Sequence, residues 1–300
     1  ILSNGNLHYF WDLERGNPYV ITQFPKPWSV KSYQTTRPNP EKLIAESITE
    51  DYIALTQYPA YKEEAAWKNE QERHAFIEKN ALRFLRKYQV LAIQSLQKSV
   101  KEGNDRFLFE MATGTGKTKT CIALIYRLLK TQRFHRILFL VDREALGEQA
   151  ANAFKDTRMD SIRSFTDIFG IKELDETAPD SDTKVQIATV QGMVKRVLYP
   201  SENKTPPAVD QYDCIVVDEC HRGYLLDRDL SDTELTFRSY EDYISKYRRV
   251  IEYFDAVKVG LTATPALHTT QIFGAPIYTY TYREAVVDGF LIDHEPPIQI

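Results

Sequence analysis

The stretch Met111-Ala-Thr-Gly-Thr-Gly-Lys-Thr118 decides the fold that we expect for this chain. It follows a short apolar run, Arg106-Phe-Leu-Phe-Glu110, which predicts a buried strand. It precedes Thr120-Cys-Ile-Ala-Leu-Ile-Tyr-Arg-Leu-Leu129, where apolar residues recur at helical spacing. A strand, a glycine-rich loop ending in Lys-Thr and a helix form an arrangement that binds nucleotide phosphates. The sequence therefore predicts a phosphate-binding loop at residues 111–118.

Each residue type in this loop has a role in phosphate binding. Backbone N–H groups and the positive end of the helix face the anion, Lys117 contacts the terminal phosphates, and the Thr118 hydroxyl ligates Mg²⁺. Met111 stands where the usual pattern has its first glycine, so a glycine turn without a ligand is the alternative for the loop alone. The expected nucleotide-binding residues of the loop are Thr113, Gly114, Thr115, Gly116, Lys117 and Thr118.

The composition indicates a soluble globular protein with one large or two medium domains. The chain has 300 residues, of which 43% are hydrophobic and 27% charged, and no apolar run approaches the roughly 20 residues that span a bilayer. The spacing of Cys121, Cys214 and Cys220 fits neither a disulfide framework nor a zinc site, which favours a cytoplasmic location. The net charge of −4 gives no global positive field, so any DNA contact must come from local groups.

Strand-like and helix-like segments alternate through the middle of the chain, which predicts an α/β fold with a parallel sheet covered by helices. The nearly continuous apolar runs are typical of strands buried on both faces. A helical pattern from residue 62 to about 100 precedes them, and segments 170–184 and 199–211 are expected to be surface loops. The expected strands are 107–110, 136–141, 185–190, 214–217 and 257–261.

Two carboxylates follow the apolar run Cys214-Ile-Val-Val217, where a strand is expected to end. Asp218 is expected to hold Mg²⁺ through water, and Glu219 to position or deprotonate the attacking water. A lone Asp-Glu pair more often marks the surface end of a strand, but here it accompanies a phosphate-binding loop.

Further polar residues follow other expected strands. Thr262 and Thr264, in Gly260-Leu-Thr-Ala-Thr-Pro265, could relay hydrogen bonds to a neighbouring domain, although an ordinary turn is the simpler interpretation. Gln89 could bind the adenine edge through its amide, or lie on a helix surface. Four more polar residues follow expected strands, and loops at the strand ends of an open sheet bind ligands. These residues could therefore contact a nucleic-acid backbone. The alternative for each of them is a solvated or helix-capping role. The candidate residues for these contacts are Arg143, Gln149, Thr189 and Gln191.

Taken in the order in which they occur along the chain, the motifs described above resemble the superfamily 2 helicase and translocase core of the DExH type. Narrower matches resemble the motor (R, HsdR-like) subunit of type I restriction endonucleases. They lie at residues 111–118, 138–143, 218–224, 253–256, 280–286 and 288–291. The resemblance implies a RecA-like motor lobe that hydrolyses ATP with Mg²⁺ and moves double-stranded DNA toward methyltransferase (M) and specificity (S) subunits. It also implies that His221 connects the nucleotide pocket to Thr262 and Thr264, and that catalysis rests on Lys117, Asp218, Glu219 and His221.

The resemblance also predicts a domain layout. Residues 1–30 would end an N-terminal nuclease domain, 31–80 would form a linker and helical region, 81–275 the first RecA-like lobe, and 276–300 the connection into a second lobe. The nuclease residues are expected upstream of Ile1, and the arginine finger in the second lobe. Residues 224–249 would form an insertion, interpreted as a solvated helical excursion or a partner-docking segment.

Two other functions remain open at this level. A DExH helicase of repair or RNA metabolism would have the same motor core without a nuclease. A nucleotide-binding assembly module would not hydrolyse ATP, and the intact Lys117, Thr118, Asp218 and Glu219 argue against it. The DNA recognition sequence and the stoichiometry of a complex do not follow from this chain.

Overall fold

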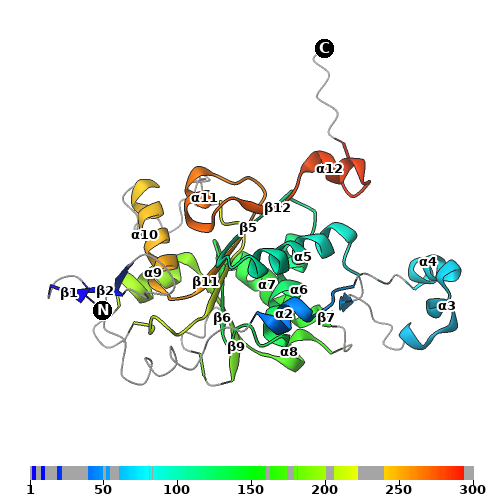
Figure 1. Ribbon diagram of the computed structural model, residues 1–300, viewed down its shortest axis with the longest axis horizontal. Helices are drawn as coiled ribbons and strands as arrows, with labels where there is room; N and C mark the ends of the chain where they lie inside the picture. The colour runs from blue at the N-terminus through cyan, green and yellow to red at the C-terminus, as the bar shows by residue number, and fades with distance from the viewer. Residues whose placement is uncertain are drawn as a thin grey trace, which may run out of the picture.

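The computed structural model contains one large sheet with helices on both faces (Figure 1). The residues that it describes are 2–4, 8–10, 19–21, 40–49, 52–54, 61–80, 82, 84–159, 163–173, 179–180, 182–200, 206–221 and 240–293.

The large sheet is parallel throughout, with strand order β12-β5-β11-β10-β6-β9-β8. All five expected strands are present, so the predicted fold class is confirmed. The strands are β5 (Arg106–Met111), β6 (Ile137–Val141), β8 (Gly170–Lys172), β9 (Thr183–Thr189), β10 (Cys214–Val217), β11 (Val257–Thr262) and β12 (Pro276–Tyr280).

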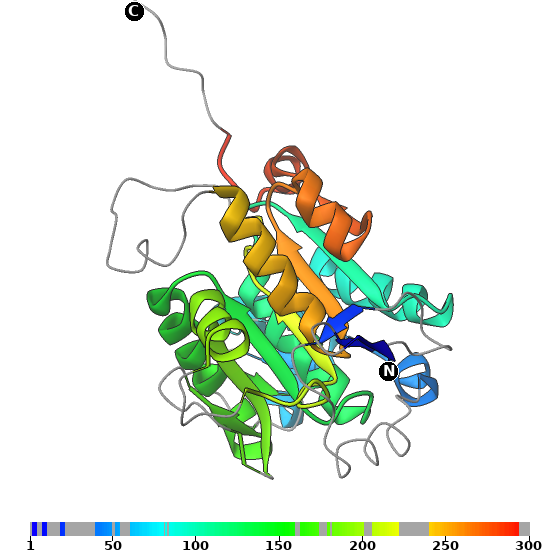
Figure 2. The same cartoon turned by 90° about the vertical axis from the view of Figure 1, so that its left-hand side faces the viewer.

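Helices cover the two faces of this sheet. One layer contains α5 (Lys87–Lys101), α6 (Lys117–Lys130), α7 (Glu144–Asp156) and α8 (Phe165–Ile168). The other contains α9 (Val190–Leu198), α10 (Tyr240–Tyr253) and α11 (Leu267–Phe273). In this second layer α9 and α10 pack against each other (Figure 2). A last helix, α12 (Tyr282–Val287), follows the edge strand β12.

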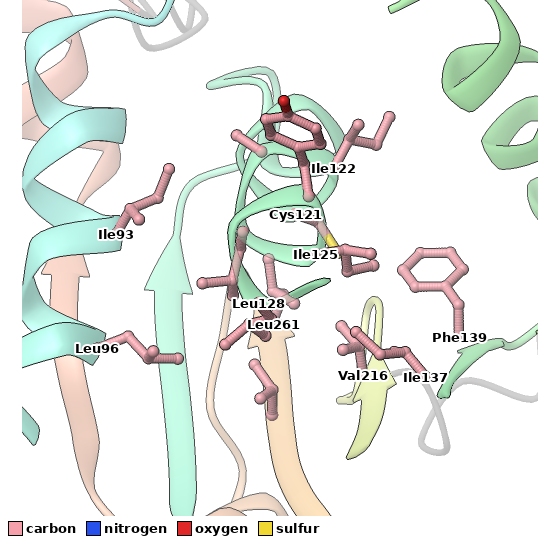
Figure 3. Close-up of a cluster of buried hydrophobic side chains, with 14 of the residues drawn as sticks. Ile93, Leu96, Cys121, Ile122, Ile125, Leu128, Ile137, Phe139, Val216 and Leu261 are labelled. Atoms are coloured by element: carbon pink, nitrogen blue, oxygen red, sulfur yellow. The ribbon is translucent and has the colours of Figure 1, made fainter. Parts of the chain in front are cut away.

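The main core lies between the sheet and the first helical layer. Apolar residues of α5 and α6 face the strands, as predicted from their helical spacing. Ile93 and Leu96 of α5, Ile122 and Ile125 of α6, and the strand residue Leu261 belong to one buried cluster, and in Figure 3 Leu128 of α6 lies beside Leu261. Burying this α6 face anchors the helix that begins at Lys117.

Smaller elements precede the large sheet in the sequence. An antiparallel sheet joins β1 (Leu2–Ser3), β2 (His8–Phe10) and β3 (Tyr19–Ile21), and β4 (Ile53–Ala54) pairs with β7 (Arg158–Met159). The remaining elements are α2 (Glu41–Ala45), the 3₁₀ helix η2 (Tyr61–Glu63), α3 (Ala65–Lys68) and α4 (Glu70–Lys79).

The helical pattern expected from residue 62 to 100 is divided in the structure. The chain leaves the helix at Asn80 and re-enters it after Arg86, whose backbone is extended. The residues before the break form a separate small cluster instead of joining the main core. That cluster contains Tyr61, Trp67, Phe76, Ile77, Leu82 and Phe84.

Two strands of the large sheet were not expected from the sequence. Strand β8 lies inside segment 170–184, which was expected to be a loop, and its three residues have no alternating apolar pattern. Strand β12 lies after residue 275 and pairs with β5, so the large sheet continues into the segment expected to be a connection. Both are edge strands, whose formation depends on a neighbouring strand more than on local sequence.

Part of the expected linker also packs onto the main core. Leu43, Ile48 and Tyr52 are buried there. The fully buried guanidinium of Arg127 on α6 donates hydrogen bonds to the carbonyl oxygens of Leu43 (3.0 Å), Ser47 (3.4 Å) and Glu46. The domain layout as a whole stays a prediction, but residues 43–48 and Tyr52 are anchored to the sheet domain.

The expected insertion at residues 224–249 ends inside helix α10. Lys246 and Tyr247 are buried, as is Val250 directly after the segment, so this last part of the segment belongs to the helical layer rather than to a solvated excursion. Residues 222–239, the expected nuclease-domain residues between the short strands, and residues 31–39, 50–51 and 55–60 of the expected linker lie outside the described part of the chain. Within the described part, no helix has the length and apolar character needed to cross a membrane.

Candidate active site

The predicted site residues gather at the carboxyl edge of three neighbouring strands. Strand β11 lies between β5 and β10, and all three run parallel. The phosphate-binding loop follows β5, Thr262 ends β11, and Asp218 follows β10. Carboxyl ends of parallel strands meet at one edge, which is where open α/β sheets bind ligands.

The phosphate-binding loop has the backbone that its glycines allow. Gly114 and Gly116 have φ angles of +84° and +80°, which residues with a side chain rarely adopt. Gly116 is the N-cap of α6 and provides no side-chain cap, so the positive helix end faces the loop. The buried Thr115 hydroxyl donates to the carbonyl of Ala112 at 2.6 Å and steadies the turn.

Lys117 pairs with Glu219 across the site. The ammonium nitrogen of Lys117 lies 3.2 Å from Glu219 Oε1, and the side chains are only 6% and 14% exposed. A buried ion pair of this kind is sensitive to a third charge, because water screens it little. A phosphate group entering the loop would compete with Glu219 for the ammonium.

Glu219 is held in an uncommon conformation. Its φ angle is +48°, a left-handed value that costs a non-glycine residue roughly 1–2 kcal/mol. Its Oε2 atom is buried without a hydrogen bond, and the nearest ionic contact is His221 Nδ1 at 3.4 Å. Strain and an unsatisfied buried acceptor persist where the surrounding structure imposes them, and they are frequent at functional sites.

His221 connects this carboxylate to strand β11. Its Nδ1 lies 2.8 Å from Thr262 Oγ1, and the same hydroxyl accepts a hydrogen bond from the backbone N–H of Thr264 at 3.1 Å. The backbone N–H of Cys220 also donates to the carbonyl of Leu261 at 2.9 Å. A continuous set of contacts therefore runs from Lys117 through Glu219 and His221 to Thr262.

Gln89 is buried next to the phosphate-binding loop, but its amide already has protein partners. Its Oε1 accepts from the backbone N–H of Arg86 at 2.9 Å, and its Nε2 donates to the carbonyls of Thr115 (3.2 Å) and Gly116 (3.3 Å). An adenine edge would have to compete with these bonds. The structure gives Gln89 the role of bracing the loop, and adenine recognition by this residue stays a prediction.

The residues predicted to hold a metal flank the site. Thr118 is half-buried in the first turn of α6, and Asp218 is half-buried directly after β10, where its Oδ1 accepts from the backbone N–H of Glu219 at 2.9 Å. Among the described residues, no group of three or more His, Cys, Asp or Glu side chains could hold a metal by itself. A hydroxyl and one carboxylate fit Mg²⁺, which takes its remaining ligands from phosphates and water.

The residues predicted to bind nucleic acid follow the next two strands of the sheet. Arg143 precedes α7 after β6, is 54% exposed, and lies 3.6 Å from Asp142. Gln149 is exposed on α7. Thr189 ends β9 and caps α9 by accepting from the N–H of Gly192 at 3.0 Å, and Gln191 is half-buried in that helix. They are placed beside the nucleotide residues, and their contact with DNA stays a prediction.

An aromatic group beside the loop was not singled out from the sequence. Tyr88 stacks on Tyr280 with centroids 4.0 Å apart, and its hydroxyl donates to the carbonyl of Thr115 at 2.6 Å. Burial raises the pKa of Tyr88, so its hydroxyl keeps the proton that it donates. Tyr280 is distant in sequence and lies on an unexpected strand, which is why no local signal revealed the pair.

The three cysteines are buried in the core of the sheet domain. Cys121, Cys214 and Cys220 are free and buried, and burial raises the pKa of each thiol well above its usual value. Protonated buried thiols are poor nucleophiles and poor metal ligands.

Comparison with known proteins shows the family to which this chain belongs. The family model described as "Type III restriction enzyme, res subunit" matches residues 83–267. The chain is 57% identical over 216 residues to the EcoKI type I restriction endonuclease subunit of Escherichia coli (strain K12), covering 72% of this chain and 18% of that protein. It is 34% identical over 218 residues to the EcoAI subunit of Escherichia coli, covering 70% and 23%.

A more distant relative is the SauCOLORF180P type I restriction endonuclease subunit of Staphylococcus aureus (strain COL), with 26% identity over 219 residues. The chain spans about a fifth of the length of these relatives, from 18% to 23%. The resemblance inferred from the motifs is thereby confirmed. This chain belongs to the restriction-enzyme res-subunit family, and the curated relatives named here are endonuclease subunits of type I restriction enzymes.

Proposed function

We propose that this chain contains the ATP-hydrolysing first lobe of a type I restriction motor, which moves double-stranded DNA and whose full-length protein cleaves it away from the recognition site. The observation that supports this best is the contact path from Lys117 through Glu219 and His221 to Thr262. It joins the phosphate-binding loop to the end of β11 through residues that can respond to phosphate charge.

The residues of this path suggest how hydrolysis begins. The Lys117 ammonium binds the terminal phosphates. Its contact with Glu219 weakens because the negatively charged phosphate oxygens compete with the carboxylate for the ammonium. The Glu219 carboxylate is then available to accept a proton from the attacking water. Thr118 and Asp218 would hold Mg²⁺, which supplies charge neutralisation for the phosphates when it is bound.

The same path gives a means of coupling hydrolysis to movement. When the Glu219 carboxylate changes its partner, the neighbouring imidazole of His221 and the Thr262 hydroxyl must rearrange their hydrogen bonds. Thr262 also holds the backbone N–H of Thr264, so the change reaches the segment after β11. The candidate DNA-binding residues Arg143 and Thr189 follow the strands on the other side of β10.

The names of the relatives favour a restriction motor over a helicase of repair or RNA metabolism. Methyltransferase and specificity subunits would be the partners, and the second lobe would provide an arginine finger, which is worth about 10³–10⁵ in rate in phosphoryl transfer. A non-hydrolysing assembly module is disfavoured because the lysine and the carboxylates meet in one site.

The test is ATP hydrolysis and DNA translocation by the full-length protein, with its methyltransferase partner and cognate DNA. Triplex displacement on linear duplex reports translocation. Lys117→Ala should abolish both activities. If that variant still moved DNA, the assignment of the motor to this lobe would be wrong.

A further inference from the structure

The segment that follows β12 folds back over the phosphate-binding loop. The carbonyl of Tyr280 accepts from the N–H of Ala112 at 3.0 Å, which joins the end of β12 to the loop. After α12 the chain turns at Gly289, whose φ is +75°, and the N–H groups of Phe290 and Leu291 donate to the carbonyl of Ala285. This turn is therefore an ordered part of the sheet domain.

Two residues of this turn reach the site. A Cβ placed on Gly114 would meet Leu291 Cδ2 at 3.1 Å, so Leu291 packs directly over the phosphate-binding loop. The Phe290 ring lies under the guanidinium of Arg86, with the carbon of that group 4.3 Å from the ring centroid. The turn therefore places one apolar side chain on the loop and one aromatic ring beside it.

The position of the Phe290 ring is tied to the loop through Tyr88. The two rings meet edge to face with centroids 5.2 Å apart, and the Arg86 Nη1 atom donates to the Tyr88 hydroxyl at 3.0 Å. The same hydroxyl donates to the carbonyl of Thr115 in the loop. The Asp288 carboxylate accepts from the hydroxyl of Tyr280 at 2.8 Å and anchors the start of the turn.

Phe290 and Arg86 nevertheless keep exposed surface. Phe290 is 38% exposed, whereas Tyr88 directly beside it is 3% exposed. An aromatic ring and a guanidinium plane bind a nucleobase by stacking, which requires no edge hydrogen bonds. The Gln89 amide, which would provide edge hydrogen bonds, is engaged by Arg86 and the loop.

We propose that Phe290, backed by Arg86, is the residue on which the nucleobase of the bound nucleoside triphosphate stacks. The inference rests on the proposed function, because the phosphates must occupy the loop at residues 111–118. It assigns base binding to a residue beyond the last strand of the sheet, so that the segment leading out of this lobe contacts the nucleotide directly.

A purely structural role would have a different consequence. If Phe290 served only to hold Tyr88 and the loop in place, its loss would weaken the binding of every ligand of the loop, with or without a base. Inorganic tripolyphosphate provides the phosphates without the base, and the non-hydrolysable analogue adenylyl imidodiphosphate provides both. Comparing the two ligands separates base stacking from support of the loop.

The experiment measures the Kd of both ligands, with Mg²⁺ present, by calorimetry on the full-length protein. Phe290→Ala should raise the Kd of the adenine analogue about tenfold and leave the Kd of tripolyphosphate unchanged. Phe290→Trp should restore binding of the analogue. Tyr199→Ala is the matched control, because Tyr199 is 54% exposed and has the Lys246 ammonium 5.4 Å from its ring, but follows α9 in the other helical layer.

Equal weakening of both ligands, or of neither, would overturn the inference while leaving nucleotide binding intact. If the wild-type protein bound neither ligand, the proposed function itself would fail, and the inference with it.

Discussion

The Lys117 ammonium lies 3.2 Å from the Glu219 carboxylate, so the cation expected to bind phosphate and the expected catalytic base are partners in one buried pair. Nucleotide binding must loosen this contact. We therefore expect the affinity for nucleotide to be linked to the availability of the Glu219 carboxylate as a proton acceptor.

Replacing Glu219 by Gln should separate those two properties. The variant removes the anion that competes with phosphate for Lys117, so nucleotide should bind severalfold more tightly. Hydrolysis should fall about 10²- to 10⁴-fold, because no base accepts the proton from water. Binding is measured by calorimetry and turnover by phosphate release from the full-length protein with DNA. Weaker binding by the Gln variant would contradict the competition between Glu219 and phosphate.

The left-handed backbone at Glu219 predicts that a Gly variant is more stable than an Ala variant at this position, the reverse of the usual order. Because φ is +48°, Glu219→Gly should be more stable than Glu219→Ala by about 1 kcal/mol in the free energy of unfolding. Glu148, exposed in the interior of helix α7, is the control, where Gly should be less stable than Ala by about 1 kcal/mol. Denaturant unfolding measures both differences, and the same order at the two positions would argue against strain at Glu219.

Thr262→Val should uncouple hydrolysis from movement. Valine keeps the shape but removes the hydroxyl that contacts His221 and accepts from the Thr264 N–H. The distance moved per ATP hydrolysed should fall, while nucleotide affinity is preserved. Thr270→Val on α11 is the control, since that hydroxyl donates only within its own helix, to the carbonyl of Leu267. Equal losses of translocation and hydrolysis would place Thr262 in the chemical step instead.

Arg127→Met should destabilise the protein by about 3 kcal/mol or more. It leaves the buried carbonyl oxygen of Leu43 and the partly buried ones of Glu46 and Ser47 without this donor, and an unsatisfied buried acceptor costs about 1–3 kcal/mol. Arg248→Met is the surface control, because its pair with Glu252 is half-exposed and worth about 0.3–0.5 kcal/mol. Chemical denaturation gives both values. A loss below 1 kcal/mol at Arg127 would mean that water replaces the guanidinium.

Lys258 predicts a pH dependence of stability. Burial lowers the pKa of Lys258 to about 8, below its ordinary value of 10.5. Between these two values the unfolded chain binds more protons than the folded protein, so this group adds stability as pH rises from about 8 toward 10.5 and disfavours folding below pH 8.

Lys258→Met should therefore reduce the slope of unfolding free energy against pH in this window, by up to about 1.4 kcal/mol per pH unit. Unfolding of both proteins by urea at several pH values gives the two slopes. Lys155→Met provides the surface control, since its ammonium is 49% exposed and pairs with Glu173. Identical slopes for wild type and Lys258→Met would show that Lys258 titrates normally.

The sequence alone was sufficient for the five central strands and for the edge of the sheet at which the expected site residues lie. Buried parallel strands are apolar on both faces, and a phosphate-binding loop is a local structure whose glycines and lysine are contiguous. Asp218 and Glu219 stand at the end of such a strand, so their place at the carboxyl edge followed from the fold class. The edge strands β8 and β12 could not be predicted from the sequence, because their formation depends on pairing with a neighbouring strand.

Contacts between residues distant in sequence were decided only by the tertiary structure. The pairing of Lys117 with Glu219, the burial of Arg127 under residues 43–47, and the packing of Phe290 beside Arg86 each join segments at least 80 residues apart. Local patterns contain the types of these residues but not the distances between them. Distances arise when strands order themselves in the sheet and helices pack on it, which brings the segment after β12 onto the loop that begins at Met111.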